Sequence, residues 1–455
     1  MGADAGLWFQ GALLADGPAA RVRLELAGGR IAAVSAGVEP QPGDWRGGFA
    51  VPGLANLHSH AFQRAMAGLT EVRGPADDSF WTWRELMYRF LERLDPDAME
   101  AIAALAFVEM LESGFTRVGE FHYLHHDPKG AAYDDPAEMA VRIAAAAEAV
   151  GVGLTLLPVF YAHGGFGGAP ATAGQRRFLS SVESYGALLE GSRRAVTGVA
   201  DAVVGVAPHS LRAVAPDELA AVAALAAGGP VHIHAAEQVK EVEDCVAWSG
   251  ARPVEWLLDN AALDERWCLV HATHLTDLET GRLARSGAVA GLCPVTEANL
   301  GDGVFPARAY LEAGGAFGLG TDSNILIDPA GELRALEYGQ RLTRRARNVL
   351  AAGAGRSTGC DLLAGAVRGG ARALGVAEAG LKAGAPADIV ALDADHPTLA
   401  GHGAASAVDA WIFAGGRELV TDVWRAGRRL VSGGRHHGRE AVVRRYRAVL
   451  QGLLA

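Results

Sequence analysis

Cysteine, lysine and long apolar runs are scarce in this chain of 455 residues. No C-x-x-C motif occurs, which argues against a thiolate zinc cluster or a dithiol redox motif and predicts reduced, buried thiols. The four cysteines are Cys245, Cys268, Cys293 and Cys360. Apolar stretches such as residues 98–111 are interrupted by glutamate and therefore predict amphipathic helices instead of membrane spans. The chain opens without a basic and then apolar leader, so we expect a cytoplasmic protein.

The charge balance is acidic, with a formal net charge of −11 and a pI near 5.8. A protein of this charge repels phosphate backbones and anionic lipids, so we expect neither nucleic acid nor a membrane as a partner. Half of the residues are hydrophobic, which is enough for one large domain and a smaller unit. We expect a small-molecule substrate as the partner, and a homodimer as the assembly.

Two patterns divide the chain. From 51 to 379, apolar runs of strand length alternate with alanine-rich helical stretches, which predicts a parallel sheet of the (β/α)8 barrel type. The clearest runs are 153–159, 203–207, 230–234, 269–271 and 288–293. Residues 1–50 and 380–455 instead show the alternation of short strands, on the C-terminal side at 388–392, 408–413 and 418–431. We expect these two ends to fold together as one small β-sandwich domain.

Histidines close several of the predicted strands. His58 and His60 follow an apolar run one residue apart, so they point to the same face at the end of a strand. Three further polar residues, His234, His271 and Asp322, each follow another apolar run. Because the carboxyl ends of parallel strands meet on one face of a barrel, these side chains should converge there. Three imidazoles and a carboxylate suit zinc and leave a position open for water.

This arrangement resembles the amidohydrolase superfamily of metal-dependent hydrolases, and the resemblance extends to the segment LKAGAPADIVALD at 381–393. It implies a (β/α)8 barrel in which His58, His60, His234 and Asp322 bind the metal and His271 lies beside the metal-bound water. In such a site Asp322 would take a proton from the water and deliver it to a leaving amine. His271 would orient the attacking water and stabilise the tetrahedral intermediate.

Lysine decides the expected number of metal ions. Two-metal members of this superfamily use a carboxylated lysine after strand 4, and no lysine lies near the expected strand 4 at 203–210. The three lysines are Lys129, Lys240 and Lys382. We therefore expect one divalent ion, with zinc as the best fit to the ligand set. Glu120 leaves a second metal open, because some deacetylases of the superfamily place a metal-binding glutamate after strand 3.

Side chains near the same strand ends predict the class of substrate. Glu237, three residues after His234, resembles the His-x-x-Glu of the deaminase branch, where the glutamate contacts a ring or amidine nitrogen. Two arginines from different loops, Arg84 and Arg212, match a substrate with two carboxylates, since a guanidinium binds a carboxylate in a bidentate manner. The alternative is that both arginines are ordinary ion-pair residues.

Four longer motifs resemble the N-formimino-L-glutamate deiminases of bacterial histidine degradation. They are HSHAFQRAMAG at 58–68, FWTWRELMY at 80–88, GEFHYLHH at 119–126 and APHSLRAV at 207–214. The resemblance implies attack of water on the formimino carbon, loss of ammonia and release of N-formyl-L-glutamate. It implies these substrate-binding positions: Gln63, Arg84, Tyr123, His209 and Arg212.

Two other functions stay open. A deaminase of guanine or of another heterocycle would keep the metal set and change the mouth of the barrel. A non-catalytic scaffold relative would typically lose metal ligands, whereas all five polar site positions are present here. The glycine-rich segment 164–168 is either a plain surface loop or a lid over the barrel mouth.

Overall fold

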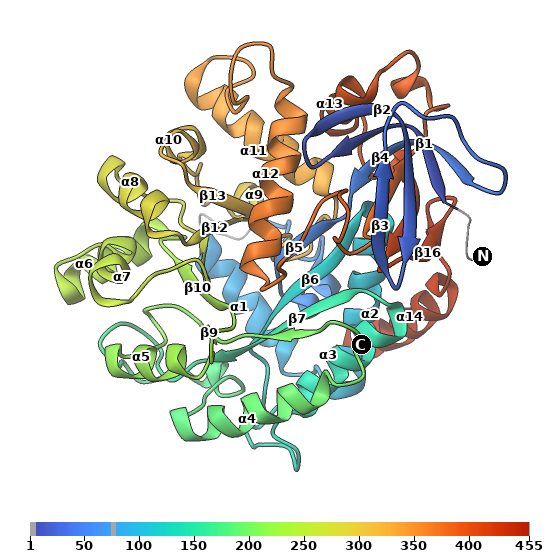
Figure 1. Ribbon diagram of the computed structural model, residues 1–455. Coiled ribbons are helices and arrows are strands. Elements are labelled where there is room, and N and C mark those ends of the chain that lie inside the picture. The colour runs from blue at the N-terminus through green and yellow to red at the C-terminus, as the bar shows by residue number, and fades with distance from the viewer. Residues whose placement is uncertain (1–5, 74–78, 455) are drawn as a thin grey trace.

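The computed structural model describes residues 6–73 and 79–454. Two β-sheets organise the chain: one is wrapped by helices, and the other lies beside it and contains strands from both ends of the chain (Figure 1). The first five residues of the predicted N-terminal β segment lie outside the described residues. Within the described ranges, no helix combines the length and the apolar character needed to cross a membrane.

The larger sheet is a closed parallel barrel, which confirms the predicted fold. Its last strand pairs with its first at Leu319 and Asn56, and parallel bridges from Val206 to Val231 and from Ser210 to His234 close the other seam. In order the strands are β5 (Leu54–Ser59), β6 (Phe115–His122), β7 (Gly153–Phe160), β8 (Val203–Val204) with β9 (Ala207–Pro208), β10 (Val231–Ala235), β11 (Trp267–His271), β12 (Val289–Leu292) and β13 (Ala316–Leu319). The expected fourth strand is thus present as two short pieces.

Helices cover the outside of the barrel, so its strands are buried on both faces and read as continuous apolar runs. Local signals set their ends: α2 begins with an Asp95 side chain that accepts from the Ala98 amide, and it ends at the left-handed Gly114. The helices are α1 (Phe80–Leu91), α2 (Pro96–Ser113), α3 (Glu138–Val150), α4 (Val182–Ala195), α5 (Pro216–Ala224), α6 (Val239–Ser249), α7 (Pro253–Asn260), α8 (Asp277–Ser286), α9 (Pro294–Leu300), α10 (Ala307–Glu312), α11 (Pro329–Arg344) and α12 (Thr358–Ala373).

The second sheet joins the two ends of the chain, as predicted. Its order is β17-β16-β15-β14-β4-β1-β2-β3, so the C-terminal strands pair with the N-terminal ones through β14 and β4. Its strands are β1 (Leu7–Leu14), β2 (Gly17–Ala27), β3 (Arg30–Ser35), β4 (Trp45–Pro52), β14 (Ile389–Leu392), β15 (Val420–Arg425), β16 (Arg428–Ser432) and β17 (Arg435–His436).

Hydrogen bonding makes this a single curled sheet instead of two stacked ones. The β3 residue Ile31 accepts from Gly384 at 2.8 Å and donates to Ala385 at 2.9 Å, so the sheet bends until β3 meets the segment before β14. The curl encloses an aromatic core in which Trp45 and Trp424 are 4.6 Å apart between ring centroids. The domain limits at residues 50 and 380 stay a proposal.

Two C-terminal segments differ from the strand pattern expected there. The predicted strand at 408–413 is wrong, because these residues end the helix α13 (Ala404–Phe413). Trp411 and Ile412 lie three and four residues after Val408, so the three form one buried face of a helix, and the four alanines of α13 favour it. The second segment is α14 (Arg439–Leu454), which follows β17. Its Arg439 and Arg445 form ion pairs with Glu112 and Glu100 on α2.

We expect the packing of α12 against β13 to tolerate no side chain at Gly369. A Cβ there would lie 1.8 Å from the Phe317 carbonyl oxygen, so Gly369→Ala should lower the free energy of unfolding by about 1–3 kcal/mol. Gly186 is the matched control, because it lies within α4 and a Cβ there would meet nothing within 4 Å. Gly186→Ala should leave stability unchanged or raise it by up to about 1 kcal/mol. Denaturant unfolding of both variants tests this, and equal stability of the two would contradict it.

Candidate active site

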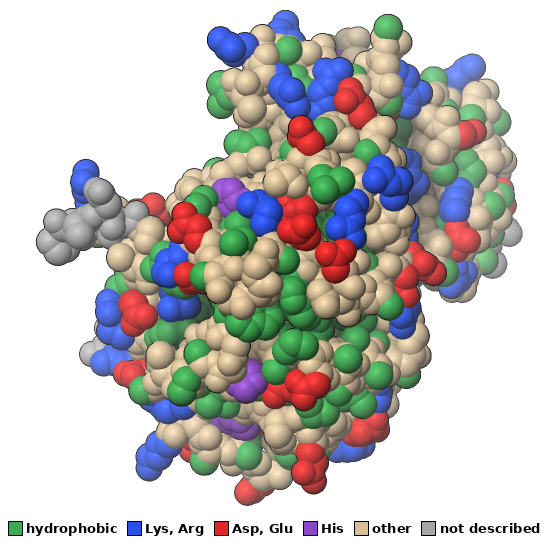
Figure 2. Space-filling view, turned by 90° about the vertical axis from the view of Figure 1, so that its left-hand side faces the viewer, with side chains coloured by type: hydrophobic (Ala, Val, Ile, Leu, Met, Phe, Trp, Pro, Cys, Tyr) green, Lys and Arg blue, Asp and Glu red, His purple; other side chains and the backbone are tan. Residues whose placement is uncertain are grey.

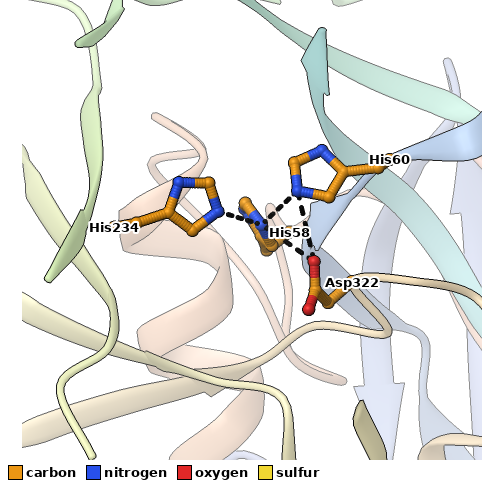
Figure 3. A group of neighbouring side chains, drawn as sticks. All are labelled: His58, His60, His234 and Asp322. Carbon is orange, nitrogen blue, oxygen red and sulfur yellow. Dashed lines mark hydrogen bonds and ion pairs between the residues drawn. The ribbon is translucent and has the colours of Figure 1, made fainter. Parts of the chain in front are cut away.

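Three histidines and one aspartate meet at the carboxyl ends of the barrel strands (Figure 3). His58 and His60 come from the end of β5, His234 from β10, and Asp322 follows β13. The Nε2 atom of His58 lies 3.2 Å from that of His60, 3.1 Å from that of His234 and 3.3 Å from Oδ1 of Asp322. All four side chains are buried. The structure therefore brings together the four predicted metal ligands.

The hydrogen bonds of these rings explain why a cation fits among them. The Nδ1 atoms of His60 and His234 donate to the carbonyl oxygens of Phe121 and His209, both at 2.9 Å. Donation from Nδ1 leaves the Nε2 atoms of the neutral rings with lone pairs that face one another and Asp322. Burial lowers the pKa of His58 to about 3 and also lowers the pKa of His60 and His234, so the rings are neutral. Converging lone pairs and a carboxylate repel one another unless a metal ion lies between them.

Asp322 is fixed to the first strand of the barrel by its backbone. Its amide donates to the His58 carbonyl at 2.9 Å, and its carbonyl accepts from the His60 amide at 2.9 Å. Asn324 reinforces this turn by donating to the Asp322 carbonyl and to Ser59 Oγ. Asp322 has a left-handed φ of 46°, a conformation that is strained for a non-glycine residue and concentrates at functional sites.

His271 lies beside this group but has different partners. Its Nδ1 is 3.2 Å from Glu297 Oε1, and its Nε2 is 3.8 Å from Glu237 Oε1. Burial alone would lower the pKa of His271, but the charges of Glu237, Glu297 and Asp322 outweigh burial and raise it to about 10. Burial raises the pKa of Glu237. His271 and Glu237, each predicted to be catalytic, thus lie close to one another next to the ligand group.

A cavity opens over these residues, and every predicted substrate-binding residue lines it. Its wall contains Gln63, Arg84, Tyr123, His209 and Arg212 together with His60, His234, Glu237, His271 and Asp322. Gln63 donates to the Tyr123 hydroxyl at 3.0 Å, and His209 Nδ1 lies 3.0 Å from Ser210 Oγ. These contacts fix the polar wall of the cavity.

The two predicted arginines have unused hydrogen-bonding capacity. The Arg84 guanidinium packs on Trp81 at 4.6 Å from the ring centroid, and Arg212 lies 3.8 Å from Glu237 Oε2. Among the described residues, neither Arg84 Nε nor Arg212 Nη1 has a hydrogen-bond partner, although both atoms are buried. Gln63 Oε1 is also buried without a partner among those residues. Buried donors and acceptors that lack a protein partner cost free energy, so their position in a cavity wall points to a polar ligand.

Glu120 contributes to the backbone around the site. Its Oε1 accepts from the Ala61 amide at 2.7 Å, and burial raises its pKa to about 8. It is not part of a metal-type group among the described residues. Two histidines of the neighbouring loop form hydrogen bonds with backbone carbonyls. His125 Nε2 donates to the Val159 carbonyl at 2.8 Å, and His126 Nε2 donates to the Leu179 carbonyl at 2.7 Å.

The predicted lid segment reaches the cavity at one residue. Gly164 lines the cavity, and its amide donates to the Ala169 carbonyl at 2.8 Å. Phe166 stacks on Trp248 with 5.6 Å between ring centroids, which holds this turn against α6. Closure over the cavity stays a prediction.

Several cavity and supporting residues were not predicted individually from the sequence. The cavity also contains Phe80, Trp83, Met87 and Tyr88 from the motif at 80–88, together with Tyr161, Phe178 and Leu300. Glu297, which contacts His271, lies on α9, and Asn56 and Asn324 hold Thr321 next to Asp322. Outside the motif, an apolar residue or a lone amide in these elements has no spacing that marks it as functional. Only the tertiary contacts identify those residues.

The comparisons with known proteins agree on one family. Residues 49–430 match the Amidohydrolase family, and residues 8–48 match "Formimidoylglutamate deiminase HutF, N-terminal domain". The chain is 51% identical over 452 residues to the formimidoylglutamate deiminase of Pseudomonas aeruginosa, covering 98% of this chain and 99% of that protein. It is 31% identical to a 5-methylthioadenosine/S-adenosylhomocysteine deaminase of Natronomonas pharaonis, covering 78% of this chain and 75% of that one.

Solved structures give the same result. The chain superimposes on an amidohydrolase from Brucella melitensis with a TM-score of 0.96 and 57% identity, covering 99% of this chain and 100% of that one. An adenosine deaminase from Xanthomonas campestris with bound zinc shares the fold at a TM-score of 0.82 and 24% identity, over 99% and 98% of the two chains. With a closed barrel, a His/His/His/Asp group at its mouth and these matches, the chain belongs to the amidohydrolase family.

Proposed function

We propose that this protein hydrolyses N-formimino-L-glutamate to N-formyl-L-glutamate and ammonia, a reaction of histidine degradation, with one bound zinc ion. The observation that carries the proposal is the position of Arg84 and Arg212: both line the cavity that contains the His/Asp group, and each buries an N–H group without a partner among the described residues. Two guanidiniums suit a substrate with two carboxylates, and N-formimino-L-glutamate is such a dicarboxylate with an amidine end. A purine offers no charge to either arginine, which argues against the heterocycle deaminases.

The relatives support this substrate. The Pseudomonas aeruginosa protein, aligned over nearly the whole of both chains, is named a formimidoylglutamate deiminase. The N-terminal segment independently matches a domain named for the same enzyme. All predicted metal and substrate positions are present and converge on one cavity, which argues against a non-catalytic scaffold.

The reaction follows from the order of groups around the ligand set. A zinc ion held by His58, His60, His234 and Asp322 would lower the pKa of a bound water from 15.7 to about 7. Asp322 accepts one proton as water attacks the formimino carbon; that proton and the one left on the attacking oxygen then both go to the formimino nitrogen, the C–N bond breaks, and the nitrogen leaves as ammonia while the oxygen becomes the formyl carbonyl. His271 and Glu237, 3.8 Å apart, flank the tetrahedral carbon and stabilise charge on its oxygen and nitrogen.

Geometry also orders the two carboxylates. The α-carboxylate is closer to the reacting carbon along the substrate than the γ-carboxylate is. Arg212 is tied to the reacting end of the cavity, because it lies 3.8 Å from Glu237, which in turn lies 3.8 Å from His271. Arg84 has no such contact with Glu237 among the described residues and packs more closely on Trp81 of α1, at 4.6 Å from the ring centroid against 5.9 Å for Arg212. We therefore assign the α-carboxylate to Arg212 and the γ-carboxylate to Arg84.

The first test is ammonia release from N-formimino-L-glutamate with the product identified by mass. The native protein should form N-formyl-L-glutamate. Asp322→Asn should slow turnover on the order of a hundredfold or more, because an amide cannot accept the proton of water. Its fold and zinc content should be checked alongside, since Asp322 is also a predicted ligand. Activity on guanine or another purine without activity on formiminoglutamate would refute the proposal in favour of a heterocycle deaminase.

The metal content is the second test. Elemental analysis of purified protein should find about one zinc per chain, and His234→Ala should lose most of it because one of the four ligands is gone. His437→Ala is the control. This histidine is exposed and directly follows β17 of the second sheet, so it is not one of the four ligands. If activity required two ions per chain, the single-metal assignment would be wrong, and Glu120 would become a candidate ligand of the second ion.

The third test concerns the arginines. Arg84→Ala or Arg212→Ala should each reduce kcat/KM about thirtyfold to several thousandfold, because each leaves a carboxylate without its charged partner, a loss of roughly 2–5 kcal/mol. Lysine should restore only part of the loss, since it lacks the bidentate fork.

A monocarboxylate analogue separates the two arginines. N-Formimino-4-aminobutyrate lacks the α-carboxylate, so it should be a poor substrate whose kcat/KM falls with Arg84→Ala and changes little with Arg212→Ala. The reverse pattern would exchange the two assignments. Unchanged kcat/KM on formiminoglutamate in both variants would show that the arginines are structural.

A further inference from the structure

The short helix α9 places a carboxylate behind His271. Glu297 Oε1 lies 3.2 Å from His271 Nδ1 and accepts from the Cys293 amide at 2.9 Å. Both Glu297 and His271 are buried. Glu297 Oε1 thus contacts both the Cys293 amide, at the start of α9, and the ring of His271, at the end of β11.

We propose that Glu297 is a positioning residue for His271: it holds the proton on Nδ1 and turns Nε2 toward the cavity. The inference rests on the proposed function, in which His271 acts at the reacting carbon. Nothing given by the family match or by the ligand group requires a residue at this place.

The carboxylate gives the direction of the bond. An ionised carboxylate can only accept, and Glu297 Oε1 also accepts from the Cys293 amide. The same oxygen faces His271 Nδ1, which must therefore be the donor of that bond. With Nδ1 protonated, the Nε2 atom faces Glu237 and the cavity.

His271 needs such support because its own backbone gives little. His271 and Ala272 have left-handed φ values of 67° and 47°, so the chain leaves the sheet at this residue. Glu237 is too distant, at 3.8 Å, to hold the ring by a hydrogen bond. Within the described residues, the contact with Glu297 is the one hydrogen bond that this ring makes.

The helix that carries Glu297 is itself anchored. The Thr296 hydroxyl donates to the Thr321 carbonyl at 3.1 Å and lies 2.9 Å from Ser323 Oγ, on either side of Asp322. The Val295 amide donates to the buried Glu332 at 2.9 Å. Neighbouring residues of α9 therefore contact the turn of Asp322 and the ring of His271, and the two catalytic side chains share one support.

Three variants test this role, with steady-state kinetics, zinc content and thermal unfolding measured on each zinc-loaded protein. Glu297→Ala removes the acceptor and should lower kcat about 10- to 100-fold, with KM within about threefold of the native value. Glu297→Gln should keep kcat within about fivefold of native. Its amide oxygen can accept both bonds, and the Cys293 N–H favours the oxygen over the NH2 group at that place.

Glu337→Ala is the matched control for stability. Glu337 is also a buried glutamate that accepts from backbone amides, those of Val349 and Leu350 at 2.9 and 3.0 Å, but it lies on α11 away from the cavity. It should lower the unfolding temperature and leave kcat unchanged. An unchanged kcat in Glu297→Ala, or a Glu297→Gln variant as slow as Glu297→Ala, overturns the proposal.

A readout without substrate separates this inference from the proposed function. In protein with 15N-labelled histidine, the His271 signals can be assigned by their loss in His271→Asn. Nδ1 of His271 should be protonated in the native and Glu297→Gln proteins and should move toward the unprotonated range in Glu297→Ala. An unprotonated Nδ1 in the native protein overturns the positioning role. If Nδ1 is protonated but formiminoglutamate is not a substrate, the proposed function fails and the positioning of His271 stands.

Discussion

The seam between the first and last strands of the barrel is the constraint on which the site depends. Leu319 pairs with Asn56, and beyond this pair the backbones of His58, His60 and Asp322 exchange hydrogen bonds. This seam joins residues more than half the chain apart, and the entropy of closing so long a loop must be overcome by the packing of the whole barrel. The ligand group therefore forms only when the barrel closes, and folding and assembly of the site are one event.

Polar groups around the site differ in how fully they are paired. Those that hold the backbone of the seam are paired: Asn56, Thr321 and Asn324 bond to one another in a buried network. Three residues that line the cavity are only partly paired: Arg84, Arg212 and Gln63 each bury an atom without a partner among the described residues. Paired groups stabilise the fold at little net cost, whereas unpaired ones reduce stability until a ligand satisfies them.

Histidines on the same rim have pKa values that shift in opposite directions, because the groups around them differ in charge. At His60 and His234 that nitrogen donates to a neutral backbone carbonyl, and burial keeps the rings neutral and suited to a metal. At His271 it meets the Glu297 carboxylate, and nearby acidic groups raise the pKa instead. On the face shown in Figure 2, acidic and basic side chains are interspersed without a large patch of one sign.

The sequence by itself determined the barrel, the joining of the two chain ends and the membership of the polar cluster. These depend on local patterns: apolar runs of strand length, and polar residues such as His58 and Asp322 directly after them, which a parallel barrel brings to one face. Tertiary structure alone decided that 408–413 is helical, that the second sheet curls into one, that Glu120 holds the Ala61 amide, and that Glu297 reaches His271. A short apolar run fits either a strand or a buried helix until its neighbours are known, and the partner of a buried carboxylate depends on the direction in which a distant helix leaves the sheet.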